Sequence, residues 1–270
     1  MNVSIDHIAL KETKIAGLLQ DIRGGHPWLW RSVVVMLAGF ATMLLLQLFD
    51  ARLFNGVSVW DKPSKFFLSL AVQFGTVSWA LSQMPRISAK LRSFNWAVAL
   101  MLIAGWGEMG YMIFRASRAE ASHFNSTSLS GIIGYAMMGI GSLSLTSTAA
   151  FIGWKIWRKR SADLWTETAG TALMAGALLG TAVGIYMSAQ TGHWVGGAQS
   201  DAGGLPLFHW STTGGDLRVA HFLGLHAAQF VPLSALSGSK PIMYLTCAVV
   251  VGMTAILFFV SAYGIPLFRA

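Results

Sequence analysis

Apolar stretches of about 20 residues recur along nearly the whole chain, and they constrain its fold more than any other feature. A helix of roughly that length crosses the hydrocarbon core of a membrane, which is about 30 Å thick. We expect such helices near residues 30–50, 62–83, 95–116, 130–154, 166–189, 216–236 and 242–264. The sequence therefore predicts an all-α integral membrane protein, a bundle of about seven transmembrane helices surrounded by lipid bilayer.

The composition agrees with this fold class. Hydrophobic residues make up 54% of the chain and charged residues 11%, whereas soluble domains carry about 25% charged residues. Residues 30–270 form the predicted transmembrane domain. Residues 1–29 form an amphipathic N-terminal segment without the pattern of a removable signal peptide. Its apolar residues follow helical spacing, which indicates a helix on the membrane surface; they are Ile5, Ile8, Ile15, Leu18, Leu19 and Ile22.

The distribution of basic residues predicts a cytoplasmic N-terminus, because short cytoplasmic segments carry an excess of Lys and Arg. With that orientation, twelve of the 19 basic residues face the cytoplasm: Lys11, Lys14, Arg23, Arg31, Arg86, Lys90, Arg92, Lys155, Arg158, Lys159, Arg160 and Lys240. The net charge of +8 is then mostly a signal of topology, and no nucleic-acid partner is expected.

The same topology brings several polar features to the outer side of the membrane. The connections 51–61, 117–129 and 190–215 lie there with the C-terminus, and they carry His123, His193 and His209. His221 and His226 follow about two and three turns into the sixth helix, at 1.5 Å per residue. Ionisable groups at membrane depth are costly and indicate function. We therefore expect a histidine-rich polar chamber that opens to the periplasm or the cell exterior.

Two further helices contribute charged side chains to this chamber. One face of the second helix carries polar residues three or four positions apart. They are Lys62, Lys65, Ser69, Gln73 and Thr76. In the third helix Glu108 shares a face with Tyr111 and Arg115, and Arg118 follows three residues later. The lysines and arginines have a plain alternative role at lipid headgroups. The side chain of Glu108 is too short to reach the headgroups. It therefore either pairs with Lys65, Arg115 or a histidine, or it carries a proton.

The two histidines of the sixth helix are five residues apart. That spacing turns them about 140° around the helix, so they do not clamp one ion as an i, i+4 pair does. We expect them to serve two subsites, with Gln229 between their faces one turn deeper. Pro232 removes a backbone donor and predicts a kink close by. The alternative is a pair of histidines that only hydrogen-bond between helices.

Two glycine-rich features complete the pattern. The 190–215 segment holds seven glycines with Trp194, Trp210 and Asp201. Its length and its two tryptophans predict an ordered lid on the outer leaflet, and the alternative is an ordinary aromatic anchor at the membrane interface. Gly176, Gly180 and Gly184 form two GxxxG steps, which allow close helix packing. A second small-residue surface on the fourth helix comprises Gly131, Gly134, Gly139, Gly141 and Ser142. These surfaces either pack within the chain or join copies of it, as a homo-oligomer or a larger membrane complex.

Three motifs resemble a family of uncharacterised bacterial polytopic membrane proteins. They are Lys62-Pro63-Ser64-Lys65-Phe66, the run Ser122-His123-Phe124-Asn125 after Arg118, and the stretch from Ser211 to Arg218 that continues through His221, His226 and Gln229. The resemblance implies a bacterial cytoplasmic (inner) membrane. It implies no activity, cofactor or catalytic residue.

These features favour a membrane protein that binds a transition metal or haem for redox or metal-assisted chemistry. The candidate ligands are four histidines, since imidazole suits zinc, iron or copper and also ligates haem b. They are His123, His193, His221 and His226. Glu108, Lys65 and Arg115 are the candidate catalytic residues. Other groups that would contact the cofactor are Arg118, Arg218, Gln229 and Asn125. Two alternatives stay open: an ion- or proton-coupled transporter, and an accessory subunit of a membrane complex.

Overall fold

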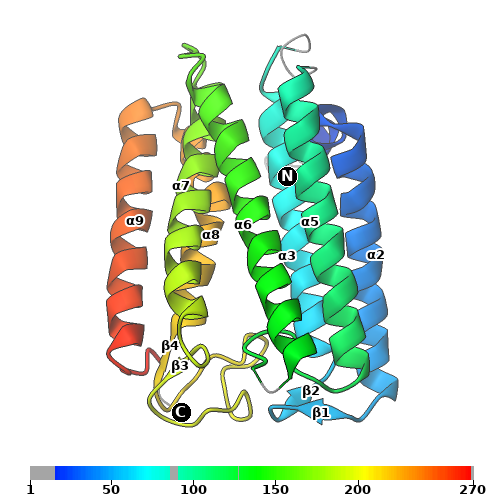
Figure 1. The fold of residues 1–270 in the computed structure, drawn as a ribbon. Helices are drawn as coiled ribbons and strands as arrows, with labels where there is room; N and C mark the ends of the chain where they lie inside the picture. Colours follow the sequence, from blue (N-terminus) through cyan, green and yellow to red (C-terminus); the bar gives the residue numbers. More distant parts are fainter. Residues whose placement is uncertain (1–15, 86–90, 127, 269–270) are drawn as a thin grey trace, which may run out of the picture.

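Long helices that run side by side make up most of this protein (Figure 1). The computed structural model describes residues 16–85, 91–126 and 128–268. Its long helices are α2 (Pro27–Phe49), α3 (Asp61–Ser82), α5 (Arg92–Ser117), α6 (Leu129–Trp157), α7 (Leu164–Ser188), α8 (Leu217–Leu233) and α9 (Lys240–Ala262). Each coincides, within a few residues, with one of the predicted apolar stretches. The all-helical class is therefore confirmed.

Six of these helices are long and apolar enough to cross a membrane, namely α2, α5, α6, α7, α8 with the turn after it, and α9. Helix α3 lies in the same bundle and packs against α2, but its first turns carry Asp61, Lys62 and Lys65. These results support an integral membrane protein with bilayer contact. A seventh crossing by α3, and the side of the membrane on which the N-terminus lies, stay predictions.

Side chains from the preceding residue cap several of these helices, which satisfies backbone N–H groups that have no partner within the helix. Ser128 accepts from Gly131 N at the start of α6, and Asp163 accepts from Thr166 N at the start of α7. Helix α8 contains the predicted Pro232 and ends one residue later. A 3₁₀ turn, Ser234–Ser237, then leads to α9, so the proline precedes a change of helix type.

The hydrophobic core lies where α2, α3 and α5 meet, and it continues towards α6 and α7. Phe74 of α3 and Phe94 of α5 are fully buried there, with Leu29 and Met36 of α2. Large apolar side chains on the outer faces of the bundle are exposed instead, among them Leu48, Ile103 and Ile140. This is the distribution of a helix bundle that lipid surrounds.

The predicted glycine surface of α7 packs within the chain, against α8. A Cβ atom on Gly176 would come within 2.8 Å of the carbonyl oxygen of Leu225, and one on Gly184 within 3.1 Å of the His221 ring. Only a glycine allows two helix backbones to approach so closely. Oligomerisation through other glycines, such as Gly139 with no atom within 4 Å of its Cβ position, stays a prediction.

The connection β1–β2 (Leu53–Phe54 and Val57–Ser58), residues 118–126 and the segment between α7 and α8 gather at one end of the bundle, at the bottom of Figure 1. Strands β3 (Trp194–Val195) and β4 (Gly215–Asp216) pair antiparallel and close the 196–214 loop. Residues 16–25 are helical at the opposite end, where Leu18 and Leu19 are about half exposed. The other apolar residues of the predicted surface helix, except Ile22, lie outside the described residues.

Candidate functional site

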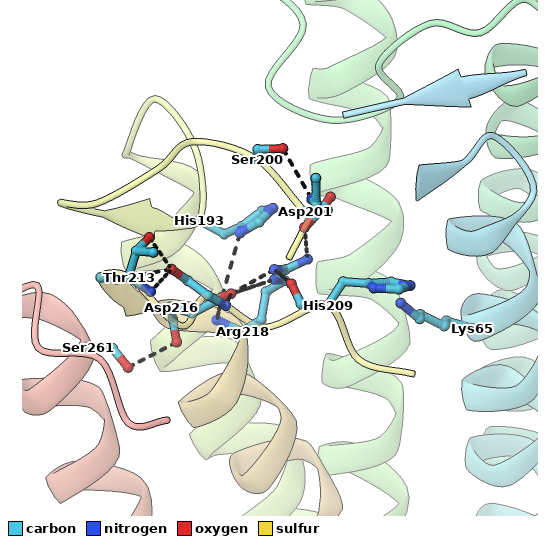
Figure 2. A network of polar contacts seen from close by, with 12 residues as sticks. Lys65, His193, Ser200, Asp201, His209, Thr213, Asp216, Arg218 and Ser261 are labelled. Atoms are coloured by element: carbon cyan, nitrogen blue, oxygen red, sulfur yellow. Dashed lines mark hydrogen bonds and ion pairs between the residues drawn. The ribbon is translucent and has the colours of Figure 1, made fainter. Parts of the chain in front are cut away.

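A network of ionic contacts centred on Arg218 and Asp216 holds the end of the bundle together (Figure 2). Arg218 Nη2 lies 2.7 Å from Asp216 Oδ2, and Nη1 lies 2.8 Å from Asp201 Oδ1 in the 196–214 loop. Arg218 Nη2 also donates to the carbonyl oxygen of His209, at 2.6 Å. One guanidinium therefore joins the start of α8 to two parts of the loop.

Asp216 is the most buried acid of this network, with 3% of the residue exposed. It accepts hydrogen bonds from the backbone N–H groups of Ser211 and Arg218, both at 3.0 Å. Burial works to raise the pKa of the Asp216 carboxyl, but the adjoining His193 and Arg218 outweigh it and hold the pKa below its ordinary value. The Ser211–Arg218 motif thus forms a helix cap and an ion pair, which is a structural role.

The 196–214 loop is also tied to α3 and to the β1–β2 hairpin. Asp201 N donates to the carbonyl oxygen of Asn55 at 3.1 Å. His209 Nε2 lies 3.3 Å from Asp61 Oδ1, and Lys65 donates to the other oxygen of that carboxylate at 2.6 Å. In Figure 2 the His209 ring points towards Lys65. The loop is thereby ordered over this end of the bundle, and Lys65 has an acid partner of its own.

Lys62 and His123 form the second polar contact of this end. Lys62 Nζ and the Ser122 hydroxyl each lie 3.1 Å from His123 Nδ1. Burial lowers the pKa of His123 well below its ordinary value, and the positive charge of Lys62 lowers it further. The imidazole is therefore neutral near pH 7. Lys62 is surrounded by other elements of the protein, yet its side chain remains accessible to solvent.

The histidines of α8 lie on two different sides of the helix, as their spacing predicts. The His221 ring lies against Gly184 of α7, and its Nδ1 atom is buried with no hydrogen-bond partner among the described residues. His226 Nδ1 lies 2.9 Å from Gln229 Oε1. Gln229 Nε2 in turn donates to the Thr76 hydroxyl on α3, at 2.8 Å. His226 and Gln229 therefore form an interhelical hydrogen-bond chain.

Glu108 lies deeper, between α5 and α6, and is 4% exposed. The hydroxyl of Ser142 lies 2.9 Å from its Oε1 atom. Neither Lys65 nor Arg115 pairs with it, because Lys65 contacts Asp61 and Arg115 contacts Glu120. Within residues 16–85, 91–126 and 128–268 we find no ion pair to Glu108. The structure thus excludes two of the three partners expected for this carboxylate and supplies a hydroxyl that the sequence did not single out.

Arg115, Arg118 and Asn125 lie together at a different place, where α5 ends and α6 begins. Arg115 Nη1 lies 2.8 Å from Glu120 Oε2, and Arg118 Nε lies 3.5 Å from Glu120 Oε1. All four residues line one cavity. The predicted site therefore divides into separate parts: the Arg218 network, the Lys62–His123 contact with His221, the His226–Gln229 chain, the Glu108 contact, and this cavity.

The predicted metal ligands do not form a complete ligand set. No group of three or more His, Cys, Asp or Glu side chains in the described part of the chain is arranged to hold a metal ion. His193 lies 3.6 Å from Asp216 and stacks near Trp194, while His221 lies against α7. The buried Nδ1 atom of His221 is nevertheless available as a ligand atom, whereas Nδ1 of His193 faces Asp216.

Sequence reasoning missed Asp61 and Ser142 as contact residues of this region. Asp61 was recognisable only as the start of a helix, and Ser142 only as a small residue on a packing surface. Their roles depend on residues far away in the chain, His209 and Glu108 respectively. No local pattern signals such contacts.

The fold and the polar end together define a helical membrane protein with ionisable groups inside its bundle. Comparisons with protein-family models, with curated proteins and with solved structures found no match. The resemblance to a bacterial membrane family consequently stays a prediction from three motifs, and the function is argued from the site alone.

Proposed function

We propose that this protein is an ion- or proton-coupled carrier in which Glu108 takes up and releases a proton. The observation that carries the proposal is the burial of this carboxyl group, 4% exposed, beside a hydroxyl and without an ion pair among the described residues. A charged side chain costs about 2.5–3.5 kcal/mol at the centre of a membrane helix on insertion scales. A carboxyl group that accepts a proton avoids this cost.

The contact with Ser142 suits both protonation states of Glu108. The Ser142 hydroxyl lies within 2.9 Å of both Glu108 Oε1 and the Met138 carbonyl oxygen. When Glu108 is ionised, the hydroxyl donates to the carboxylate. When Glu108 is protonated, its O–H donates to Ser142 Oγ, and the hydroxyl proton turns to Met138. Because a hydroxyl is both donor and acceptor, one serine stabilises either state without rearrangement of the helices.

Lys62 provides a link from Glu108 to the polar end. It is close enough to Glu108 to attract the carboxylate electrostatically, and it contacts neutral His123 at 3.1 Å. The accessible Lys62 side chain indicates that water reaches this part of the bundle. A solvent-accessible cation next to a neutral imidazole, with a buried carboxyl beyond them, is an arrangement found in proton and ion pathways through membranes.

The test is proton-coupled flux in liposomes that contain the purified protein and a trapped pH-sensitive dye. We expect an imposed ion gradient to change the internal pH with the native protein and not with Glu108→Gln, because the amide keeps the shape and cannot titrate. Glu167→Gln is the matched control: Glu167 lies on α7 and pairs with Lys240 and Tyr244. Native flux from Glu108→Gln would contradict the proposal.

Binding of a transition metal or haem b is a second candidate function. It is favoured by the buried Nδ1 atom of His221, which lacks a hydrogen-bond partner within the described residues. His123 is close enough to interact electrostatically with His221, so these two side chains would be the first ligands to test, with His193 at the Asp216 network. A bound metal or haem would supply Lewis-acid or electron-transfer chemistry.

An absorption spectrum and a metal analysis of the purified protein test this second function. If it holds, His221→Ala loses the haem band or the metal, whereas His26→Ala keeps it, because His26 lies at the opposite end of the bundle, at the start of α2. A colourless, metal-free protein that supports flux favours the carrier. One that is inert and stable only beside another membrane protein favours an accessory subunit.

A further inference from the structure

A cavity of about 580 Å³ lies where α5 ends and α6 begins. Arg115 and Arg118 approach it from the end of α5, and Ser128, the cap of α6, lies opposite. Asn125 lines it from the connection between the two helices. Its volume is within the range of about 300–1,000 Å³ that is usual for small-molecule sites.

The charged groups of this cavity favour an anion. Two guanidinium groups share one carboxylate, that of Glu120, so one positive charge is left over. The Arg115 side chain is 8% exposed and also donates to the Ala121 carbonyl oxygen, which fixes its position. The Arg118 side chain is 58% exposed, so it is free to turn towards a ligand. The first N–H groups of α6 add the partial positive charge of a helix N-terminus.

Tyr111 forms one wall of the cavity. Its ring lines the same cavity, and its hydroxyl oxygen is buried without a hydrogen-bond partner in the described part of the chain. The hydroxyl lies against Gly134 of α6, so Tyr111 closes the cavity on that side and its hydroxyl does not face a ligand.

The surroundings of the cavity indicate where its ligand comes from. Phe114, which also lines the cavity, is 51% exposed, and Leu129 and Ile133 on the first turns of α6 are 73% and 52% exposed. These apolar side chains belong to helices long and apolar enough to contact lipid. A molecule with an anionic head and apolar chains therefore fits both the cavity and its edge.

We propose that this cavity binds the phosphate group of an anionic phospholipid, with Arg115 and Arg118 as donors and the acyl chains lying along α5 and α6. Arginine recognises phosphate through paired N–H donors, and basic pockets between transmembrane helices bind the head groups of anionic lipids. The site includes neither Glu108 nor any histidine. The lipid proposal therefore goes beyond the proposed carrier function, and the two are tested independently.

Native mass spectrometry of the detergent-purified, full-length protein tests the proposal. Phosphatidylglycerol and phosphatidylcholine are added in separate titrations, and inorganic phosphate is added as a competitor. We expect phosphatidylglycerol to bind at one preferred site. Arg118→Gln should weaken that binding about 10-fold, because it removes a charged hydrogen-bond donor to the phosphate. Tyr111→Phe should leave the binding unchanged, because the Tyr111 hydroxyl lies against Gly134 of α6.

Arg158→Gln is the matched control for Arg118→Gln. Arg158 also lies at a helix end and also stacks on an aromatic ring, that of Trp154, but it caps the far end of α6. Binding that Arg158→Gln leaves unchanged and Arg118→Gln reduces supports the site. Equal loss in both variants, equal binding of the two lipids, or binding of inorganic phosphate without preference for the lipid would overturn the proposal.

Discussion

The hydroxyl oxygen of Ser142 on α6 lies 2.9 Å from Oε1 of Glu108 on α5. Gly141, the residue before Ser142, leaves room for this contact. A Cβ atom on Gly141 would come within 2.6 Å of the same carboxylate oxygen. The acid therefore occupies space that only a glycine on the facing helix leaves open. A glycine that looks like a packing residue in the sequence thus positions the most buried carboxyl group of this interface.

Gly141→Leu should displace the Glu108 side chain and abolish proton-coupled flux, because the larger side chain occupies the position of the carboxylate. Overpacking of this kind also costs about 1–3 kcal/mol of stability. Gly139→Leu on the same helix serves as the control, since no atom lies within 4 Å of its Cβ position. Flux in liposomes and thermal unfolding in detergent are the measurements. Unchanged flux from Gly141→Leu would argue against a role for Glu108.

Asp216→Asn should loosen the 196–214 loop and destabilise the protein. It leaves Arg218 with Asp201 as its one acid partner among the described residues, and losing a buried hydrogen bond between charged groups costs about 1.5–3 kcal/mol. The free energy of unfolding and the rate of proteolysis within the loop would report this. Lys240→Gln removes a more exposed ion pair, with Glu167, and should cost less than about 1 kcal/mol. Equal costs for the two variants would contradict the network described above.

Lowering the pH from 7 to 5 should reduce stability, and His123 should account for part of the loss. The pKa of His123 lies well below its ordinary value in the folded protein, because of burial and the nearby charge of Lys62. In the unfolded chain this histidine takes up a proton as the pH falls through about 6.5, while the folded protein resists it. The melting temperature of His123→Asn should therefore depend less on pH. An identical pH profile for both proteins would rule out this explanation.

The 196–214 loop and the end of α6 should be labelled from opposite sides of the membrane. Leu207 in the loop and Lys159 just beyond α6 are both exposed, so each accepts a single cysteine in a Cys247→Ala background. The predicted topology places Leu207→Cys within reach of an impermeant thiol reagent in intact cells and shields Lys159→Cys. The reverse labelling pattern would place the polar end in the cytoplasm.

The sequence by itself determined the class of this protein and the limits of its helices. Apolar stretches of membrane-spanning length are a local property, because each helix satisfies its own backbone hydrogen bonds. For the same reason the spacing of His221 and His226 correctly predicted two different directions around the helix, since both residues belong to one helix whose geometry fixes them. That the two histidines serve two subsites stays a prediction. The spacing of the α7 glycines also predicted that they allow close helix packing. The sequence did not predict that α8 is the helix that packs against them.

Only the tertiary structure decided which polar groups from different elements meet. Lys65 and Asp61 are four residues apart on α3, a spacing that indicates an ion pair already in the sequence. The contact of Arg218 with Asp201 in the 196–214 loop has no such local signal. Lys65 and Arg115 each have an acid close by in the chain, so neither pairs with Glu108. Ser142 is the partner of Glu108, and Thr76 is the partner of Gln229. In both pairs the two residues lie on different helices, far apart in the chain. Such contacts arise from the rotation and depth of each helix in the bundle, which the packing of its whole surface sets.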